Sequence, residues 1–485
     1  MNNTVQKKLF SGLFWVLLLN LLIKPFWFFG IEVSVQNAVG AEAYGFYFTL
    51  FNFAYIFNIL LDIGITNFNT RNIAQHPQLI DKHLSGILCV KLLLLALYVV
   101  VTFTVGLLLG YTSRQFYLLA FLSFNQFLNS LILYLRSNFE GLLLFKWDSI
   151  ISILDRVIMI LICGALLWLP GHPTFRIEYF VYAQTAAYLL TAATALMVLM
   201  RKTGFRRLRF NWPFTLVVLK QSAPFALLVL LMASYNRLDP VLLQKLLPDG
   251  DYQAGIYAGA FRLLDALTMV AYLVSVPLLP VYSKLTKQNS ESGNLLKDTT
   301  RMVFSMMMVF SVMAAVLCYF MADPLMDLLY RNNPAEYTPV FKILVFGIIP
   351  ISITYVFGTL LTAAGRLRQL NILAACTLLI NVAVNLLLIP LLGAVGSAWA
   401  SLAAQSFMAL TQLVIALRIF NLRPSWGYIL KLLLFTLVII GCNLVPVGSM
   451  WFRLVLVVVL GLSIAILLKL INPFEIKKII TEKEI

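Results

Sequence analysis

Charged side chains are scarce in this sequence, in which 12% of the 485 residues are Asp, Glu, Lys or Arg and 61% are hydrophobic. Soluble globular domains contain about 25% charged residues, so the composition excludes an ordinary soluble protein. Polar intervals between the apolar runs are also short. The chain is therefore predicted to form one integral membrane domain rather than several soluble domains.

Residues that support disulfide, metal or nucleotide chemistry are few as well. The cysteines all lie within apolar runs and form no CxxC pair: Cys89, Cys163, Cys318, Cys376 and Cys442. The histidines are scattered without ligand spacing: His76, His83 and His172. We expect the cysteines to be small core residues. No GxxxxGK[ST] motif occurs, so we predict no metal, no cofactor, no catalytic residue and no ATP site.

Long apolar runs are the main feature of the sequence. A membrane-spanning helix needs about 20 apolar residues. Fourteen runs qualify: 10–34, 44–68, 84–110, 115–138, 148–169, 177–200, 221–246, 252–282, 300–322, 339–363, 369–391, 394–417, 427–446 and 451–471. The first run is too long for a signal-peptide core and lacks a small-x-small cleavage site, so we expect it to be retained. The predicted fold class is an all-α polytopic membrane protein.

Basic residues are concentrated in alternate loops, above all in RKTGFRRLR, which begins at Arg201. By the positive-inside rule these loops and both termini are predicted to be cytoplasmic. The net charge of +16 then reflects topology rather than a nucleic-acid partner. Binding of anionic lipid headgroups is the alternative interpretation of the loop at 201–213.

The sequence resembles itself at an offset of 210 residues, where 39–52 aligns with 249–262. The identical pairs are Gly40 with Gly250, Gly45 with Gly255, Tyr47 with Tyr257, and Phe51 with Phe261. Parallel repeats of this kind build many transporters from two halves around a central site. We predict two pseudo-symmetric six-helix lobes, 1–200 and 221–418, a basic cytoplasmic inter-lobe loop at 201–220, and two further helices with a cytoplasmic tail in 419–485.

The repeat places polar residues on both predicted helices at spacings of three or four. The second run carries Asn52, Tyr55, Asn58, Asp62 and Thr66, and the eighth carries Arg262, Asp265, Thr268, Tyr272 and Ser275. Spacing of this kind puts the residues of each run on one helix face. Polar faces in a bilayer avoid lipid, so we expect them to line a cavity. A polar seam that holds the helices together is the alternative.

The seventh run contains SYNRLDPVLLQ, residues 234–244. Arg237 and Arg262 each lie about twelve residues from the turn near LPDGD, or about 18 Å at about 1.5 Å per residue, which is close to the membrane midplane. Asp239 lies at nearly the level of Arg262, and Asp265 lies one turn deeper, within reach of Arg237. The four charged residues are therefore predicted to form one cluster. Pro240 removes a backbone donor and should bend the helix here.

Further basic residues occur within the first lobe. Lys24 precedes a proline in the first run, and we expect Asp62 to lie across the hairpin from it. Lys91 and Arg156 rank lower, because Lys91 is within snorkelling reach of the cytoplasm and Arg156 neighbours Asp155. A cavity with these basic residues would suit a phosphate or pyrophosphate, whose oxygens match the donors of arginine. A site for cationic drugs would need carboxylates in excess.

Residues 380–402, INVAVNLLLIPLLGAVGSAWASL, contain Asn381, Asn385, Pro390, Gly393 and Gly396 in an N-x3-N-x4-P-x2-G-x2-G pattern. This pattern resembles the signature of polysaccharide flippases in the multidrug/oligosaccharidyl-lipid/polysaccharide exporter superfamily. The segments AAGRLRQLN at 363–371 and AGIYAGAFRLLDALTMVAYLVSVPLLPVYSKL at 254–285 are similar to that family too. Locally, we expect Pro390 to end a helix and the two glycines to allow a tight hairpin.

The resemblance implies an O-antigen-type or capsule-type flippase, which is not an enzyme. Such proteins move an undecaprenyl-pyrophosphate-linked oligosaccharide across the bacterial inner membrane by alternating access, and glycosyltransferases and a polysaccharide polymerase are the implied partners. Related lipid II flippases carry a basic residue in helix eight followed by an acid three residues later, which Arg262 and Asp265 match. The drug-exporting branch has an acidic first-helix site, where this chain has Lys24.

From this resemblance and the charge pattern we expect three groups of site residues. Lys24, Arg237 and Arg262 would bind the pyrophosphate, and Asp62, Asp239 and Asp265 would orient them or couple a proton or sodium ion. Further polar residues would line the cavity: Asn52, Tyr55, Asn58, Asn236, Thr268 and Tyr272. The first alternative is a multidrug cation antiporter. A membrane glycosyltransferase or polymerase is a much weaker alternative, because such enzymes usually need a substantial outer loop and the longest one here is 322–338.

Overall fold

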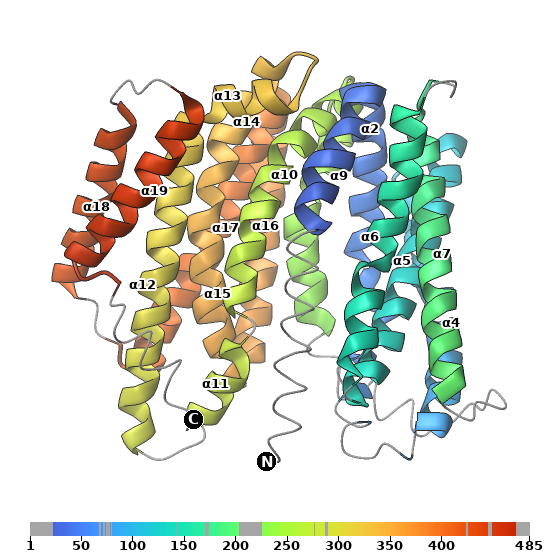
Figure 1. The fold of residues 1–485 in the computed structure, drawn as a ribbon, viewed down its shortest axis with the longest axis horizontal. Helices are drawn as coiled ribbons and strands as arrows, with labels where there is room; N and C mark the ends of the chain where they lie inside the picture. The colour runs from blue at the N-terminus through green and yellow to red at the C-terminus, as the bar shows by residue number, and fades with distance from the viewer. Residues whose placement is uncertain are drawn as a thin grey trace. The chain divides into compact units, whose positions relative to one another are not determined.

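The computed structural model describes residues 23–66, 69–70, 73, 78, 80–142, 144–169, 174–202, 226–275, 277–286, 290–422, 425–444 and 449–471. These residues are nearly all helical and include no strand (Figure 1). Eleven helices in them are long and apolar enough to cross a membrane, or twelve if the bent pair Ala226–Arg237 and Asp239–Leu246 is one span. Most of the predicted first span, 10–22, lies outside the described residues. The chain is thus a multi-span all-α protein.

The chain divides into two compact units, Met1–Gly255 and Ile256–Ile485, and the division falls within helix α10 (Gly250–Ser275). The predicted basic loop at 201–220, with its RKTGFRRLR cluster, lies outside the described residues from 203 onward. The predicted lobe boundaries and the cytoplasmic position of that loop therefore stay predictions.

Helix α5 (Ser113–Gly141) is the central helix of the first unit. It packs against α2 (Val33–Ile56), α4 (Ile80–Leu108), α6 (Phe145–Trp168) and α7 (Ile177–Lys202), as Figure 1 shows on its right-hand side. Protein therefore surrounds α5, and polar side chains on it avoid lipid. Those that are buried include Ser123, Asn125, Gln126, Ser130, Ser137 and Asn138.

The first two spans meet at Gly40, whose φ of 83° interrupts the helical backbone of α2. A left-handed conformation of this kind is accessible to glycine without a steric penalty. The described part of the first span includes a π-helical turn, η1 (Phe26–Glu32), directly after Pro25. The first span therefore continues as far as Gly40, past the predicted end at residue 34.

The second span is broken, although a continuous helix over 44–68 was predicted. Helix α2 ends at Ile56 and a short 3-10 turn, η2 (Asn58–Leu61), follows it. Ile63 and Gly64 then have φ values of 42° and 78°. A branched residue with positive φ costs roughly 1–3 kcal/mol unless its surroundings hold it there. The prediction of a single polar face through Asn52, Asn58 and Asp62 is therefore wrong.

The second unit contains the rest of α10 and, within the described residues, nine further α-helices. These are α11 (Leu278–Leu285), α12 (Ser290–Phe320), α13 (Ala322–Leu329), α14 (Pro334–Leu344), α15 (Ile348–Ala363), α16 (Leu367–Leu392), α17 (Ala394–Ile419), α18 (Trp426–Leu444) and α19 (Met450–Leu467). Helix α17 packs against α14, α15 and α16, while α18 and α19 pack together on α12 (Figure 1). The predicted outer loop 322–338 thus contains a helix.

The hairpin between α16 and α17 is as tight as its small residues predict. A methyl group on Gly396 would meet the carbonyl of Leu388, so the two helices approach at backbone distance. The expectation that Pro390 ends the helix is wrong. The helix continues to Leu392 and ends where Gly393 takes a φ of 56°. Pro390 removes only one backbone donor, so the helix continues past it. The positive φ of Gly393 is what reverses the chain.

The two copies of the predicted repeat have matching local structure. The rings of Tyr47 and Phe51 in α2 are 5.8 Å apart, and so are those of Tyr257 and Phe261 in α10. Gly45 and Gly255, also matched at the offset of 210, lie against each other, because a methyl group on Gly45 would meet the backbone nitrogen of Gly255. The repeat of two pseudo-symmetric lobes stays a prediction.

Candidate functional site

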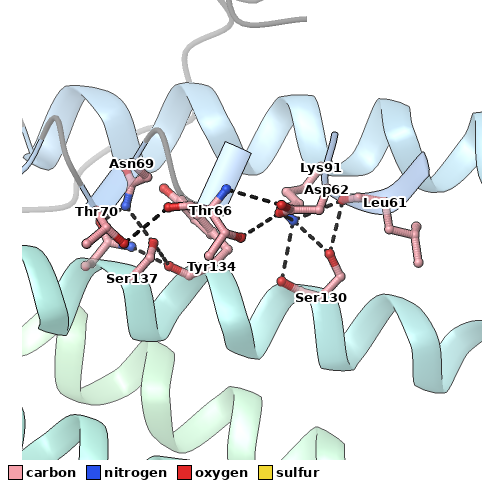
Figure 2. Close-up of polar contacts among 10 residues, drawn as sticks. Leu61, Asp62, Thr66, Asn69, Thr70, Lys91, Ser130, Tyr134 and Ser137 are labelled. Atoms are coloured by element: carbon pink, nitrogen blue, oxygen red, sulfur yellow. Dashed lines mark hydrogen bonds and ion pairs between the residues drawn. The ribbon is translucent and has the colours of Figure 1, made fainter. Parts of the chain in front are cut away.

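The break in the second span surrounds the ammonium group of Lys91, which comes from α4 (Figure 2). Lys91 Nζ donates to Asp62 Oδ1 at 2.6 Å, to Ser130 Oγ at 2.8 Å and to the Leu61 carbonyl at 3.0 Å. The carbonyl of Ser130 is 3.4 Å away. The Lys91 side chain is only 1% exposed. The sequence analysis placed Lys91 within snorkelling reach of the cytoplasm. In the structure its side chain does not snorkel, because its partners lie inside the first unit.

Asp62 has a second partner besides Lys91. Its Oδ1 accepts a hydrogen bond from Thr66 Oγ1 at 2.6 Å, and its Oδ2 accepts one from the Thr66 backbone nitrogen at 3.4 Å. The predicted pairing of Asp62 with Lys24 is thus replaced by an ion pair with Lys91. The side chain of Asp62 remains 24% exposed, so one side of this buried ion pair is accessible.

A second polar layer lies beside this ion pair (Figure 2). Asn69 Nδ2 donates to Ser137 Oγ at 2.8 Å and to Asn138 Oδ1 at 3.0 Å. The sequence analysis did not single out Ser130, Ser137 or Asn138. The sequence did contain a pattern that points to these residues. Polar residues occur in α5 at 123, 126, 130 and 137, and spacings of three, four and seven place them on one face of the helix.

Arg156 lies near the middle of the 24-residue helix α6, and its side chain is 28% exposed. Its guanidinium is 5.1 Å from the ring centroid of Trp27, and its Nε is 3.5 Å from Asp155 Oδ2. Trp27 in turn donates from Nε1 to Glu32 Oε1 at 2.9 Å. Trp27 belongs to the first span, which also carries Lys24. The structure thus packs Arg156 against the span that contains Lys24.

Arg237 ends the helix Ala226–Arg237, just before a bend of 49° that leads into α9 (Asp239–Leu246). The bend precedes Pro240, as predicted, because the proline ring disturbs the turn before it. The Pro240 carbonyl accepts a hydrogen bond from Thr49 Oγ1 at 3.2 Å. The Arg237 guanidinium lies 5.2 Å from the ring centroid of Tyr55, which is partly exposed. Arg237 and Tyr55 therefore form a cation–π pair.

Two other predicted polar residues of the first unit donate to backbone carbonyls one helical turn earlier. Asn236 Nδ2 donates to the Met232 carbonyl at 2.8 Å, and Asn52 Nδ2 donates to the Phe48 carbonyl at 2.7 Å. Asn58 instead reaches α5, where its Nδ2 is 2.6 Å from Gln126 Oε1. Asp239 is completely buried at the start of α9. Asn58 thus serves as a link between elements, which is the alternative that the sequence left open.

Arg262 in the second unit is buried, with 4% exposure. Its Nη1 donates to the Tyr330 hydroxyl at 2.7 Å, and that hydroxyl donates to the Gly259 carbonyl at 3.0 Å. Tyr330 stacks on Tyr337 with ring centroids 4.2 Å apart. A methyl group on Gly259 would meet the Tyr337 ring, so only glycine lets this aromatic pair pack here. Arg262 therefore anchors the segment between α13 and α14 onto α10.

Farther along α10, Thr268 donates to the Asp265 carbonyl at 2.8 Å and Tyr272 packs beside Tyr355 at 6.1 Å. The predicted cluster of Arg237, Asp239, Arg262 and Asp265 draws its members from both units and stays a prediction. Within the residues that the structure describes, no group of three or more His, Cys, Asp or Glu could hold a metal ion.

Comparison with known proteins gives one family and one fold. The family model for polysaccharide biosynthesis proteins matches residues 9–286. An uncharacterised membrane protein of Methanocaldococcus jannaschii is 24% identical over 380 residues, which cover 75% of this chain and 87% of that protein.

Two solved structures have the same fold. The lipid II flippase MurJ in its inward closed conformation is similar with a TM-score of 0.69 and 14% identity, over 93% of this chain and 98% of that chain. An inward-facing multidrug resistance MATE family transporter of the MOP superfamily has a TM-score of 0.63 and 12% identity, over 81% and 94% of the two chains. At these identities the similarity establishes the fold alone.

Proposed function

Because the chain belongs to the polysaccharide biosynthesis protein family, we propose that it is a flippase for lipid-linked oligosaccharides. The substrate is an undecaprenyl-pyrophosphate-linked repeat unit, which alternating access of the two halves moves between the leaflets of a bacterial inner membrane. Both termini are cytoplasmic in this proposal. Glycosyltransferases would supply the substrate, and a polysaccharide polymerase would consume it.

The observation that carries the proposal is Arg156 and its surroundings. A guanidinium near the middle of a membrane-spanning helix is costly, and residues of this kind mark substrate pathways. Arg156 keeps 28% of its side chain exposed while its guanidinium lies over the Trp27 ring. The forked N–H donors of a guanidinium match the oxygens of a phosphate. With Lys24 on the same span as Trp27, the basic residues of this region favour an anionic headgroup over a cation in this proposal.

Arg237 extends the same chemistry to the bent helix. Its guanidinium also lies over an aromatic ring, that of Tyr55, and in this proposal it binds the pyrophosphate together with Arg156. Asp239 and Asp265 serve in this proposal to balance the basic groups between cycles or to couple an ion, whereas Asp62 is paired with Lys91. The membrane potential, worth about 2.3 kcal/mol per charge per 100 mV, is a sufficient source of energy for a charged substrate.

The test is translocation of a fluorescent prenyl-pyrophosphate oligosaccharide in liposomes that contain the purified full chain. We expect Arg156→Ala and Arg237→Ala to slow translocation at least about tenfold, since each removes charge-assisted hydrogen bonds worth about 1.5–3 kcal/mol. The matched control is Arg114→Ala, because the side chain of Arg114 is 67% exposed and pairs with Glu178. Unchanged rates in both test variants would contradict the proposed headgroup site.

A multidrug cation antiporter is the second candidate, because the MATE transporter structure has the same fold. Expression of the chain in a drug-sensitive host distinguishes the two. Lowered drug sensitivity, together with no translocation of the lipid-linked oligosaccharide, would favour the antiporter.

A further inference from the structure

The oxygen atoms around Lys91 Nζ form a shell of the kind that holds a monovalent cation. The shell consists of Asp62 Oδ1, Ser130 Oγ and the carbonyl oxygens of Leu61 and Ser130, at 2.6–3.4 Å from the nitrogen (Figure 2). Carboxylate and carbonyl oxygens replace the hydration shell of a bound cation. We propose that this shell, the Lys91 cage, is a monovalent-cation site that the chain fills with its own ammonium group.

The break in the second span builds the cage. In a continuous helix the Leu61 carbonyl would accept from the backbone nitrogen of residue 65, but Ile65 instead donates to the Asp62 carbonyl at 2.9 Å. The Leu61 carbonyl is left for Lys91 Nζ at 3.0 Å and Ser130 Oγ at 3.1 Å. Unwound segments of spanning helices coordinate ions with carbonyls released in this way. An ordinary ion pair between two helices would not require an unwound main chain.

The charge of the cage specifies a monovalent occupant. Asp62 is the carboxylate that contacts Lys91 Nζ, so one positive charge balances it. A divalent ion would leave an uncompensated charge inside the membrane, which is costly. The Tyr134 ring, with its centroid 6.0 Å from the ammonium, also favours a cation at this point.

Covalent attachment makes the occupant permanent. A tethered group has a very high effective concentration at its own site, so a free ion does not displace it. The first unit therefore needs no dissociable cation at this break. Removal of the lysine side chain should leave a site for a small monovalent cation. This inference goes beyond the proposed function, because its test measures stability and not translocation.

The experiment measures thermal unfolding of the purified full chain in detergent, with Lys91→Ala as the main variant. Methylammonium chloride is titrated against choline chloride at constant ionic strength, since methylammonium replaces the deleted ammonium group and choline is too bulky for the cage. Sodium and potassium chloride form two further arms. We expect the Lys91→Ala melting temperature to rise saturably by at least about 2 °C in methylammonium. The unchanged protein should not respond.

Two further variants separate a specific site from a general salt effect. Lys342→Ala removes a lysine from an exposed ion pair with Asp323, 3.0 Å apart, and should show no response. Lys91→Ala combined with Asp62→Asn removes the carboxylate of the cage and should lose the response. A saturable rise confined to Lys91→Ala supports the proposal.

Three outcomes would overturn the proposal. Methylammonium does not raise the melting temperature of Lys91→Ala, or it raises that of Lys342→Ala equally, or it raises that of the double variant equally. If Lys91→Ala is not folded in choline, it is produced in methylammonium, where a filled cage should restore folding. Failure to obtain folded protein in methylammonium as well also contradicts the proposal.

Discussion

The two copies of the internal repeat begin alike and then diverge. Both have the same glycines and the same Tyr–Phe pair, with rings 5.8 Å apart. In the first copy α2 ends at Ile56 and the chain unwinds through Gly64, whereas in the second copy α10 remains helical to Ser275. At the offset of 210, Gly64 is replaced by Val274 and Asp62 by Tyr272. The second copy therefore lacks the residues that form and stabilise the break.

The difference shows two ways in which a polar residue is accommodated within a membrane-spanning bundle. In the first copy the main chain opens, and Lys91 and Ser130 from neighbouring helices satisfy the released groups. In the second copy the helix stays closed, and Arg262 is satisfied by the hydroxyl of Tyr330. Unsatisfied groups in hydrocarbon cost several kcal/mol, so each copy needs partners from outside its own helix.

The largest expected effect comes from the break. Asp62→Ala leaves the Lys91 charge buried without its carboxylate, and we expect a loss of about 3 kcal/mol in the free energy of unfolding. Asp323→Ala is the control, since its ion pair with Lys342 is exposed and should contribute less than about 1 kcal/mol. Equilibrium unfolding in micelles measures both. Equal losses in the two variants would show that the break does not depend on its ion pair.

The shared glycine contact should give the next largest effect. A methyl group on Gly45 would meet the carbonyl of Asp251 and the backbone nitrogen of Gly255. Gly45→Ala should therefore cost about 1–3 kcal/mol, seen as a lower melting temperature. Gly441→Ala is the matched control because a methyl group there meets nothing within 4 Å, and it should be neutral or slightly stabilising. A neutral Gly45→Ala would argue against the close contact.

The anchor of the second copy should give an intermediate effect. Tyr330→Phe removes the hydroxyl that joins Arg262 to the Gly259 carbonyl but keeps the ring stacked on Tyr337. We expect a loss of about 1–2 kcal/mol in the free energy of unfolding. Tyr319→Phe, at a ring that is 39% exposed, should change it little. The prediction fails if the two substitutions have the same effect.

The smallest effect is expected where the first copy meets the bent helix. A double-mutant cycle of Tyr55→Leu and Arg237→Gln should give a coupling free energy of about 0.5–1 kcal/mol, typical of a cation–π pair that is partly exposed. Tyr117→Leu combined with Arg237→Gln is the matched control, because the ring of Tyr117 packs beside Phe121. No coupling between Tyr55 and Arg237 would contradict the observed stacking.

Local patterns predicted much of this fold. The apolar runs that lie in described residues correspond to helices, and the bend before Pro240 and the tight hairpin at Gly396 follow from the chemistry of single residues. Errors arose where neighbouring residues in the sequence did not determine the outcome. Nothing near Lys91 in the sequence indicates that its ammonium reaches Asp62, because Lys91 lies on α4 and Asp62 lies in the break of the second span.

The sequence alone determined that the chain is an all-α membrane protein with an internal repeat, because hydrophobicity and helix periodicity are properties of local residue order. It also supplied the basic residues from which the anionic substrate is proposed. The tertiary structure decided which polar groups satisfy one another: Lys91 with the broken second span, Arg156 with Trp27, and Arg262 with Tyr330. Those partners come from different helices, and only packing sets the distances between them.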